Sequence, residues 1–157
     1  MNNVLIRKLE ISDIDYCIKM TIDSFGDEYP ENQFYSIRDE FLESFEDDWW
    51  GRPKYFVAAI DDKIVGMAGY VQSWLDWDTF EFFWLSVDKS FKGKGIGKLL
   101  TEYLENQVKQ FSSIKKDITI LFSCTKNVVS YHEKNGYKLI LEKASGVEFI
   151  MGKTILK

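Results

Sequence analysis

The order of apolar and polar residues divides the chain into strand-like and helix-like segments. Runs rich in β-branched and aromatic residues predict strands, whereas apolar residues three or four positions apart predict helices. Strands are expected at 4–9, 54–60, 63–71, 79–87 and 117–124, and in YKLILE and EFIMGKTIL near the end. These segments alternate with helical patterns, which is typical of an α+β protein.

Two helical segments are predicted before the first hairpin. Ser12, with Asp15 three residues later, resembles a capping box for the first of them. Its apolar stripe consists of Ile14, Ile18, Ile22 and Phe25. The second helix is expected after Pro30, with Phe34, Ile37, Phe41 and Phe45 on one face and Glu40, Glu43, Glu46, Asp47 and Asp48 on the other.

Two further helices are predicted in the second half of the chain. Apolar residues from Ile96 to Val108 recur at helical spacing. A short helix from about Asn127 to Lys134 should end at Asn135-Gly136, because glycine readily adopts the conformation that closes a helix.

The connections between strands predict the sheet. Asp61-Asp62 reads as the turn of an antiparallel hairpin. Strand 79–87, the following helix and strand 117–124 imply a parallel, right-handed crossover. We therefore expect a mixed, mostly antiparallel, twisted sheet of six to seven strands with about four helices.

Composition limits the classes of function. The chain has 157 residues, 45% of them apolar, and two prolines, so a single domain over residues 1–157 is expected. Apolar runs such as Phe82 to Leu85 are far shorter than a membrane span. The net charge of -5 argues against a nucleic-acid surface.

The rare residues exclude other sites. One histidine and two distant cysteines, Cys17 and Cys124, do not make a metal-ligand cluster. The start of the chain lacks a signal-peptide pattern, so a cytoplasmic location with both thiols reduced and buried is expected.

Gly93, Gly95 and Gly97 lie between a buried strand and the first turn of a helix. Unpaired backbone N–H groups and the positive end of the helix dipole meet at this place, and glycine lets a ligand approach the backbone. Three nearby lysines, Lys92, Lys94 and Lys98, add positive charge. This pattern favours a phosphate or diphosphate site over a plain turn.

Two common phosphate motifs do not fit. A Walker A loop needs Ser or Thr after its Gly-Lys, and here Leu99 follows Gly97-Lys98. The spacing of the third glycine also differs from a dinucleotide-binding fingerprint, and the loop lies in mid-chain after a hairpin.

The same stretch resembles the pyrophosphate loop of the GNAT superfamily of acetyl-CoA-dependent N-acetyltransferases. That loop has Gln or Arg, two residues, Gly, one residue, and Gly or Ala; Lys92, Gly95 and Gly97 occupy these places. Lys replaces the usual Gln or Arg and keeps the charge without the forked donors of Arg. The stretches AIDDKIVGMAG and HEKNGYKL resemble neighbouring motifs, so the resemblance covers nearly the whole chain.

The resemblance implies acetyl-CoA as the cosubstrate, with no metal. The fourth and fifth strands would splay apart, and Leu85, Ser86 and Val87 would pair with the pantetheine arm. The diphosphate would be held by the loop residues Lys92, Gly93, Lys94, Gly95, Ile96, Gly97 and Lys98. The family's cofactor-binding Asn falls at Thr125, and nearby Asn127 is the candidate to replace it.

Glu81 is the candidate general base. It is the only ionisable residue from Phe80 to Val87, and the family often has a catalytic Glu at this place. Burial among aromatic residues would raise its pKa toward the useful range. The alternative is a strand-end carboxylate that faces solvent or pairs with a lysine.

His132 is the candidate general acid for the departing thiolate. It occupies the place where the family usually has a Tyr, four residues before Gly136. Tyr131 is an alternative, but a one-residue shift turns a helical side chain by about 100°, so Tyr131 is expected in the core. A third alternative is that no residue has this role.

The acceptor side is the least defined. Trp74, Asp76 and Trp77 could form an aromatic, anionic entrance for a cationic amine, or they could be a surface lid. The leading function is acetyl transfer to a primary amine of a small molecule or protein, by direct attack in a ternary complex. The alternative is a non-catalytic acyl-CoA-binding or sensor module. A homodimer through an edge strand stays open, and no nucleic-acid or membrane partner is expected.

Overall fold

The computed structural model describes residues 4–26, 36–46, 51–111 and 117–156. Its strands form one mixed sheet in the order β1-β2-β3-β4-β5-β7-β6. The strands are β1 (Leu5–Lys8), β2 (Lys54–Ile60), β3 (Lys63–Gln72), β4 (Thr79–Val87), β5 (Ile118–Thr125), β6 (Lys138–Glu142) and β7 (Glu148–Ile155). Among the strand pairs of these described residues, only β4–β5 is parallel. The predicted fold class is confirmed.

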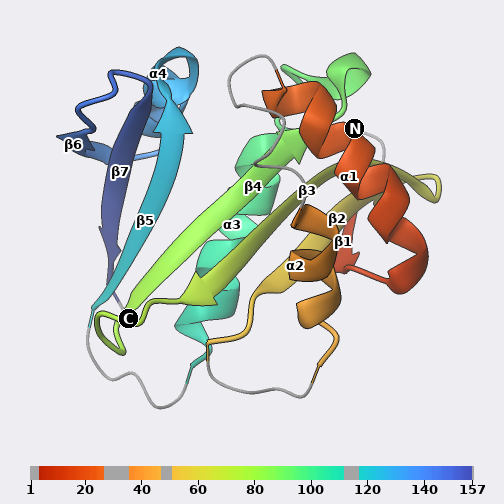
Figure 1. Cartoon of the computed structure of the whole chain (residues 1–157), viewed down its shortest axis with the longest axis horizontal. Coiled ribbons are helices and arrows are strands. Elements are labelled where there is room, and N and C mark those ends of the chain that lie inside the picture. Colours follow the sequence, from red (N-terminus) through yellow and green to blue (C-terminus); the bar gives the residue numbers. More distant parts are fainter. Residues whose placement is uncertain (1–3, 27–35, 47–50, 112–116, 157) are drawn as a thin grey trace.

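Helices cover both faces of the sheet (Figure 1). The α-helices of the described residues are α1 (Ile14–Phe25), α2 (Ile37–Glu43), α3 (Ile96–Lys109) and α4 (Val129–Lys134). Figure 1 shows α1 and α2 in front of the sheet, α3 behind it, and α4 beyond the end of β5. No helix in the described ranges has both the length and the apolar character needed to cross a bilayer.

Two apolar layers hold these helices on the sheet. On the α3 side, Ile96, Leu100 and Leu104 pack on sheet residues such as Phe80 and Phe82. On the α1–α2 side, buried residues from both helices pack on β2 and β3, including Ile14, Cys17, Ile37, Phe41, Tyr55, Val57 and Met67. Phe82 of β4 belongs to the first layer and the adjacent Phe83 packs on the second, as the two-residue period of a strand requires.

The predicted hairpin and crossover are present. Asp61 and Asp62 have φ angles of 47° and 62°, as a tight turn between β2 and β3 requires. The β4–α3–β5 connection returns the chain to a strand parallel to β4.

Some predicted details of the first two helices are wrong. The Glu10 backbone N–H donates to Asp13 Oδ2 at 2.8 Å, so the capping pair is Glu10–Asp13 and not Ser12–Asp15. Arg7 on β1 also donates to Asp13. The helical segment therefore begins earlier than predicted, with a short 3-10 turn at Ile11–Asp13. Ile22 and Phe45 were expected to face the core but are exposed.

The predictions for Pro30, Phe34, Asp47 and Asp48 lie outside the described residues.

β4 and β5 separate partway along their length. Their pairing runs only from Thr79–Thr119 to Phe82–Phe122. Beyond that point β4 continues beside β3, and β5 continues beside β7. The V-shaped divergence of β4 and β5 toward their carboxyl ends is visible in Figure 1, and it confirms the predicted splay.

Candidate functional site

A cavity of about 580 Å³ lies where β4 and β5 diverge. Its walls come from the end of α1, the second half of β4, the start of α3, the end of β5, and α4. The sequence-predicted residues that line it are Leu85, Val87, Lys92, Gly93, Gly95, Ile96, Gly97, Lys98, Asn127 and His132. The fold therefore brings together most of the predicted cofactor-binding residues.

The N-terminus of α3 opens into this cavity without a capping side chain. Gly93 and Gly95 have φ angles of 75° and 81°, in the left-handed region that favours glycine. A Cβ added at either position would meet no atom within 4 Å. Gly95 is the N-cap of α3, so the first amides of the helix and its positive dipole end are accessible to an anion.

Gly97 is required for a different reason. A Cβ added there would lie 2.9 Å from the hydroxyl oxygen of Tyr131. The glycine thus allows α4 to approach the first turn of α3.

The three lysines of the loop differ in their surroundings. Lys92 and Lys98 line the cavity, and Lys98 also pairs with Glu102 at 3.7 Å. The ammonium of Lys94 lies 4.6 Å from the centre of the Phe91 ring, and Lys94 does not line the cavity.

The β4 wall offers main-chain groups to a ligand. Past Phe82 the strand has no β5 neighbour, so Leu85 and Val87 border the opening. Ser86 between them is 1% exposed and does not line the cavity. A β-bulge shifts the β3–β4 register here, and Trp84 within it has a φ of 51°.

The bulge is held from α2. The indole N–H of Trp84 donates to the Glu40 carboxylate at 3.2 Å, and the Tyr55 hydroxyl donates to the same group at 2.9 Å. These contacts restrain a backbone conformation that bulky residues rarely adopt.

Tyr131 and His132 exchange the environments that were predicted for them. His132 is 4% exposed and packs against the rings of Phe122, Tyr131 and Tyr137. Burial lowers the pKa of His132 to about 4. The imidazole is therefore neutral near pH 7 and lacks the acidic proton of an imidazolium.

Tyr131 is half-buried instead of lying in the core. Its hydroxyl oxygen is buried beside Thr101 and meets no hydrogen-bond geometry with any described residue. The Thr101 hydroxyl donates to the Gly97 carbonyl at 3.0 Å. Burial raises the pKa of Tyr131 above its ordinary value, although the neighbouring Thr101 hydroxyl lowers it in part, and the charge of Glu102 adds to the rise. The group stays protonated and can act as a donor.

The predicted burial of Glu81 is wrong. Its side chain is exposed and does not line the cavity. Glu81 alternates with the buried Phe80 and Phe82, so it shares the other face of β4 with Phe83, which does line the cavity. The carboxylate thus lies on an open sheet face, one pleat from the opening.

The predicted acceptor residues lie at the other end of β4. Trp74, Asp76 and Trp77 precede Thr79, about 26 Å of strand from Val87 at about 3.3 Å per residue. They are exposed, and the Asp76 carboxylate accepts from the Asp78 amide and the Thr79 hydroxyl. They are not among the residues that line the cavity.

Several residues of the cavity wall carry no signal in the sequence. Ser24 and Phe25 enter from the end of α1, and Cys124 from β5. No local motif marks them, because only the packing of α1 across the sheet brings them to the site. Within the described ranges, no group of three or more His, Cys, Asp or Glu side chains could hold a metal ion.

The lowered pKa of His132 predicts a pH effect on stability. The unfolded chain binds a proton at His132 near pH 6.5, but the native protein does so only near pH 4. Stability from this residue is therefore complete above pH 6.5 and decreases as the pH falls, by about 2 kcal/mol at pH 5. Urea unfolding at pH 7 and pH 5 should show a smaller pH effect in His132→Gln than in the wild type.

The chain has one histidine, so its imidazole NMR signal provides a direct control. A titration of that signal near pH 6.5 in the folded protein would contradict the buried, neutral assignment.

Comparisons with known proteins agree with this geometry. A model of the acetyltransferase (GNAT) family matches residues 18–137. The structure of PaiA N-acetyltransferase from Thermoplasma acidophilum in complex with coenzyme A has a TM-score of 0.74 and 20% identity, and the match covers 98% of this chain and 99% of that chain. A search of curated protein sequences found no match.

Other solved structures share the fold. An aminoglycoside 6'-N-acetyltransferase complexed with coenzyme A has a TM-score of 0.70 and 21% identity over 98% of each chain. A GNAT-family acetyltransferase from Staphylococcus aureus Mu50 has a TM-score of 0.76 and 15% identity over 97% of this chain and 99% of that one. With a family model over most of its length and this fold, the chain belongs to the GNAT family of acetyltransferases.

Proposed function

We propose that the protein transfers the acetyl group of acetyl-CoA to a primary amine, by direct attack in a ternary complex. The observation that carries this proposal is the cavity between the diverging strands, with the uncapped N-terminus of α3 at its mouth. Its volume of about 580 Å³ lies in the range of small-molecule sites. Two structural neighbours are named N-acetyltransferases, which supports nitrogen as the acceptor atom.

The coenzyme would be held mainly by backbone groups. The diphosphate fits the amides of the Gly93–Lys98 segment, with the charges of Lys92 and Lys98 beside it. Lys94 would add positive charge only from outside the cavity, because its ammonium lies over the Phe91 ring. The pantetheine arm would add to the free edge of β4 at Leu85, Ser86 and Val87, with Asn127 on the opposite wall.

The reaction forms a C–N bond and breaks the C–S bond of the thioester. A primary amine with a pKa of about 10 must first lose a proton. Glu81 is our candidate for this step, because its carboxylate lies on the open face next to Phe83, where an acceptor can reach the opening from solvent.

The coenzyme A thiolate then leaves and takes up a proton. Tyr131 suits this step better than His132: its hydroxyl is protonated, unpartnered among the described residues and next to Gly97. His132 would serve by packing the aromatic cluster behind Tyr131. Tyr131 replaces His132 as the proposed acid for this reason.

A second candidate is an acyl-CoA-binding module that does not catalyse transfer. The neutral state of His132 favours it, because the predicted imidazole acid is lost. Thiol release from acetyl-CoA, measured with a panel of amines and peptides, separates the two functions and identifies the acceptor.

Gly95→Ala should weaken coenzyme binding by at least about tenfold, because its Cβ would enter the space above the α3 amides. Gly146→Ala is the matched control. Gly146 also has a left-handed φ, of 67°, and no atom near an added Cβ, but it lies outside the cavity wall. Calorimetry with coenzyme A should detect the loss in the first variant only; equal affinities in both would contradict the anion site.

Glu81→Gln should reduce turnover by about a hundredfold or more, the typical effect of losing a general base, and should leave coenzyme A affinity unchanged. Glu142→Gln removes another exposed strand carboxylate and should behave like the wild type. Steady-state thiol release with the identified amine provides the test. Full turnover in Glu81→Gln would exclude Glu81 as the base.

A further inference from the structure

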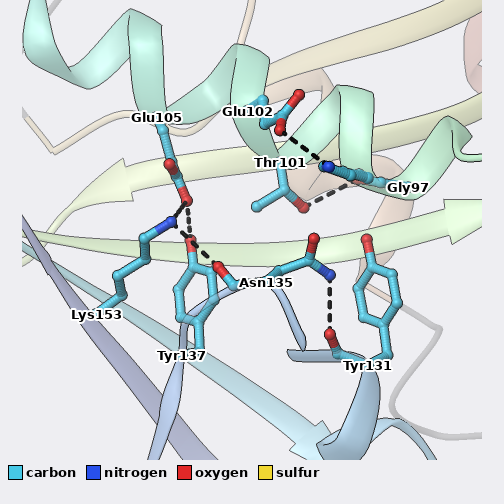
Figure 2. A network of polar contacts seen from close by, with 9 residues as sticks. Gly97, Thr101, Glu102, Glu105, Tyr131, Asn135, Tyr137 and Lys153 are labelled. Carbon is cyan, nitrogen blue, oxygen red and sulfur yellow. Dashed lines mark hydrogen bonds and ion pairs between the residues drawn. The ribbon is translucent and has the colours of Figure 1, made fainter. Parts of the chain in front are cut away.

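A polar network, here called the joint, connects α3 to the C-terminal part of the chain (Figure 2). It consists of Glu105, Tyr137, Lys153 and Asn135. Glu105 of α3 accepts a hydrogen bond from the Tyr137 hydroxyl at 2.9 Å and from the Lys153 ammonium of β7 at 2.8 Å. The side chains of Glu105 and Lys153 are only 12% and 24% exposed. Water therefore screens this ion pair much less than a surface pair.

The joint extends to the end of α4. Lys153 also donates to the Asn135 carbonyl at 3.2 Å, and the Asn135 side-chain amide donates to the Tyr131 carbonyl at 2.8 Å. These contacts satisfy carbonyls that a helix end leaves unpaired, and they put a positive charge at the negative end of the helix dipole. Lys153 thus connects Glu105 to the backbone of Tyr131.

The other side of the joint is one face of α3. Gly97, Thr101 and Glu105 are four residues apart and lie along that face. Figure 2 shows the Tyr131 ring standing beside the Gly97 end of this row, whereas Lys153 and Tyr137 meet the Glu105 end. One helix therefore carries both the proposed diphosphate site and the anchor of α4.

We propose that Lys153, through Glu105 and Asn135, positions the Tyr131 hydroxyl toward the sulfur of bound coenzyme A. This inference rests on the proposed function. Lys153 does not line the cavity, so it is a positioning residue and not a catalytic one.

The reason is that, apart from packing against the His132 ring, few contacts fix this hydroxyl. α4 has six residues, too few to be a stable helix alone. Gly97 has no side chain to hold the Tyr131 ring, and the hydroxyl has no hydrogen-bond partner among the described residues. The location of the hydroxyl is therefore set by where the C-terminal end of α4 is attached.

The test is the pKa of the coenzyme A thiol when bound to the protein, followed by the ultraviolet absorbance of the thiolate. A hydroxyl that donates to the thiolate lowers this pKa. Tyr131→Phe should raise it by about one unit, and Lys153→Met should give a similar rise while changing coenzyme A affinity less than about threefold. Lys153→Met should have no further effect in the Tyr131→Phe background.

Lys143→Met is the matched control. It removes a different ion pair of β7, with Glu148 at 2.7 Å, that does not include Glu105 or Asn135, and should leave the thiol pKa unchanged. Glu105→Gln keeps an oxygen acceptor and removes the charge, and it serves as a second variant if Lys153→Met does not fold. It should raise the thiol pKa in the same direction.

The outcomes separate the two proposals. If Tyr131→Phe raises the thiol pKa but Lys153→Met and Glu105→Gln do not, the positioning role is wrong and the joint only stabilises the fold. If the wild-type protein does not bind coenzyme A, the proposed function fails, and the positioning role fails with it.

Discussion

The site depends on the point at which β4 and β5 stop pairing. Four residue pairs join the two strands, and beyond Phe82 the sheet opens. Unpaired backbone groups inside a protein are costly, so an opening of this kind is stable only at a place where water or a ligand can reach it. The bulge at Trp84 adds backbone strain of about 1–3 kcal/mol, which the contacts of Glu40 help to offset. Both features leave the edge of β4 available to a strand-like ligand.

The crossover places the second half of the site. Because the β4–β5 connection is parallel, the chain must leave β4 at its carboxyl end and return through a helix. The topology therefore places the N-terminus of α3 beside the opening. Gly93 and Gly95 have no side chains, so they leave the first amides of α3 open to the cavity. The diverging strands and the proposed anion-binding helix end therefore lie together because a single connection joins them.

The sequence predicted the elements well and the orientations of single side chains poorly. The bounds of β4 and the hairpin at Asp61-Asp62 follow from local period and turn chemistry, which do not depend on the rest of the chain. The exposure of Glu81 depends on which strands α1 and α2 cover, and that is a long-range property. The exchange of Tyr131 and His132 has a similar origin: a one-residue difference in helix phase turns a side chain by about 100°, and the 3-10 turn at Lys126–Val128 before α4 fixes that phase.

The joint at Glu105 has no local signal because its partners are 32 and 48 residues away along the chain. Its place in the fold nevertheless follows from α3. A helix of fourteen residues is about 21 Å long, so its first turn can hold a diphosphate while a later turn anchors another element. Gly97 and Glu105 are two turns apart on one face, so α4 lies against the helix near the first while Lys153 connects its end to the second. Gly97 leaves room for α4, and Glu105 holds the lysine that contacts the end of α4. Both residues therefore restrict where α4 can lie.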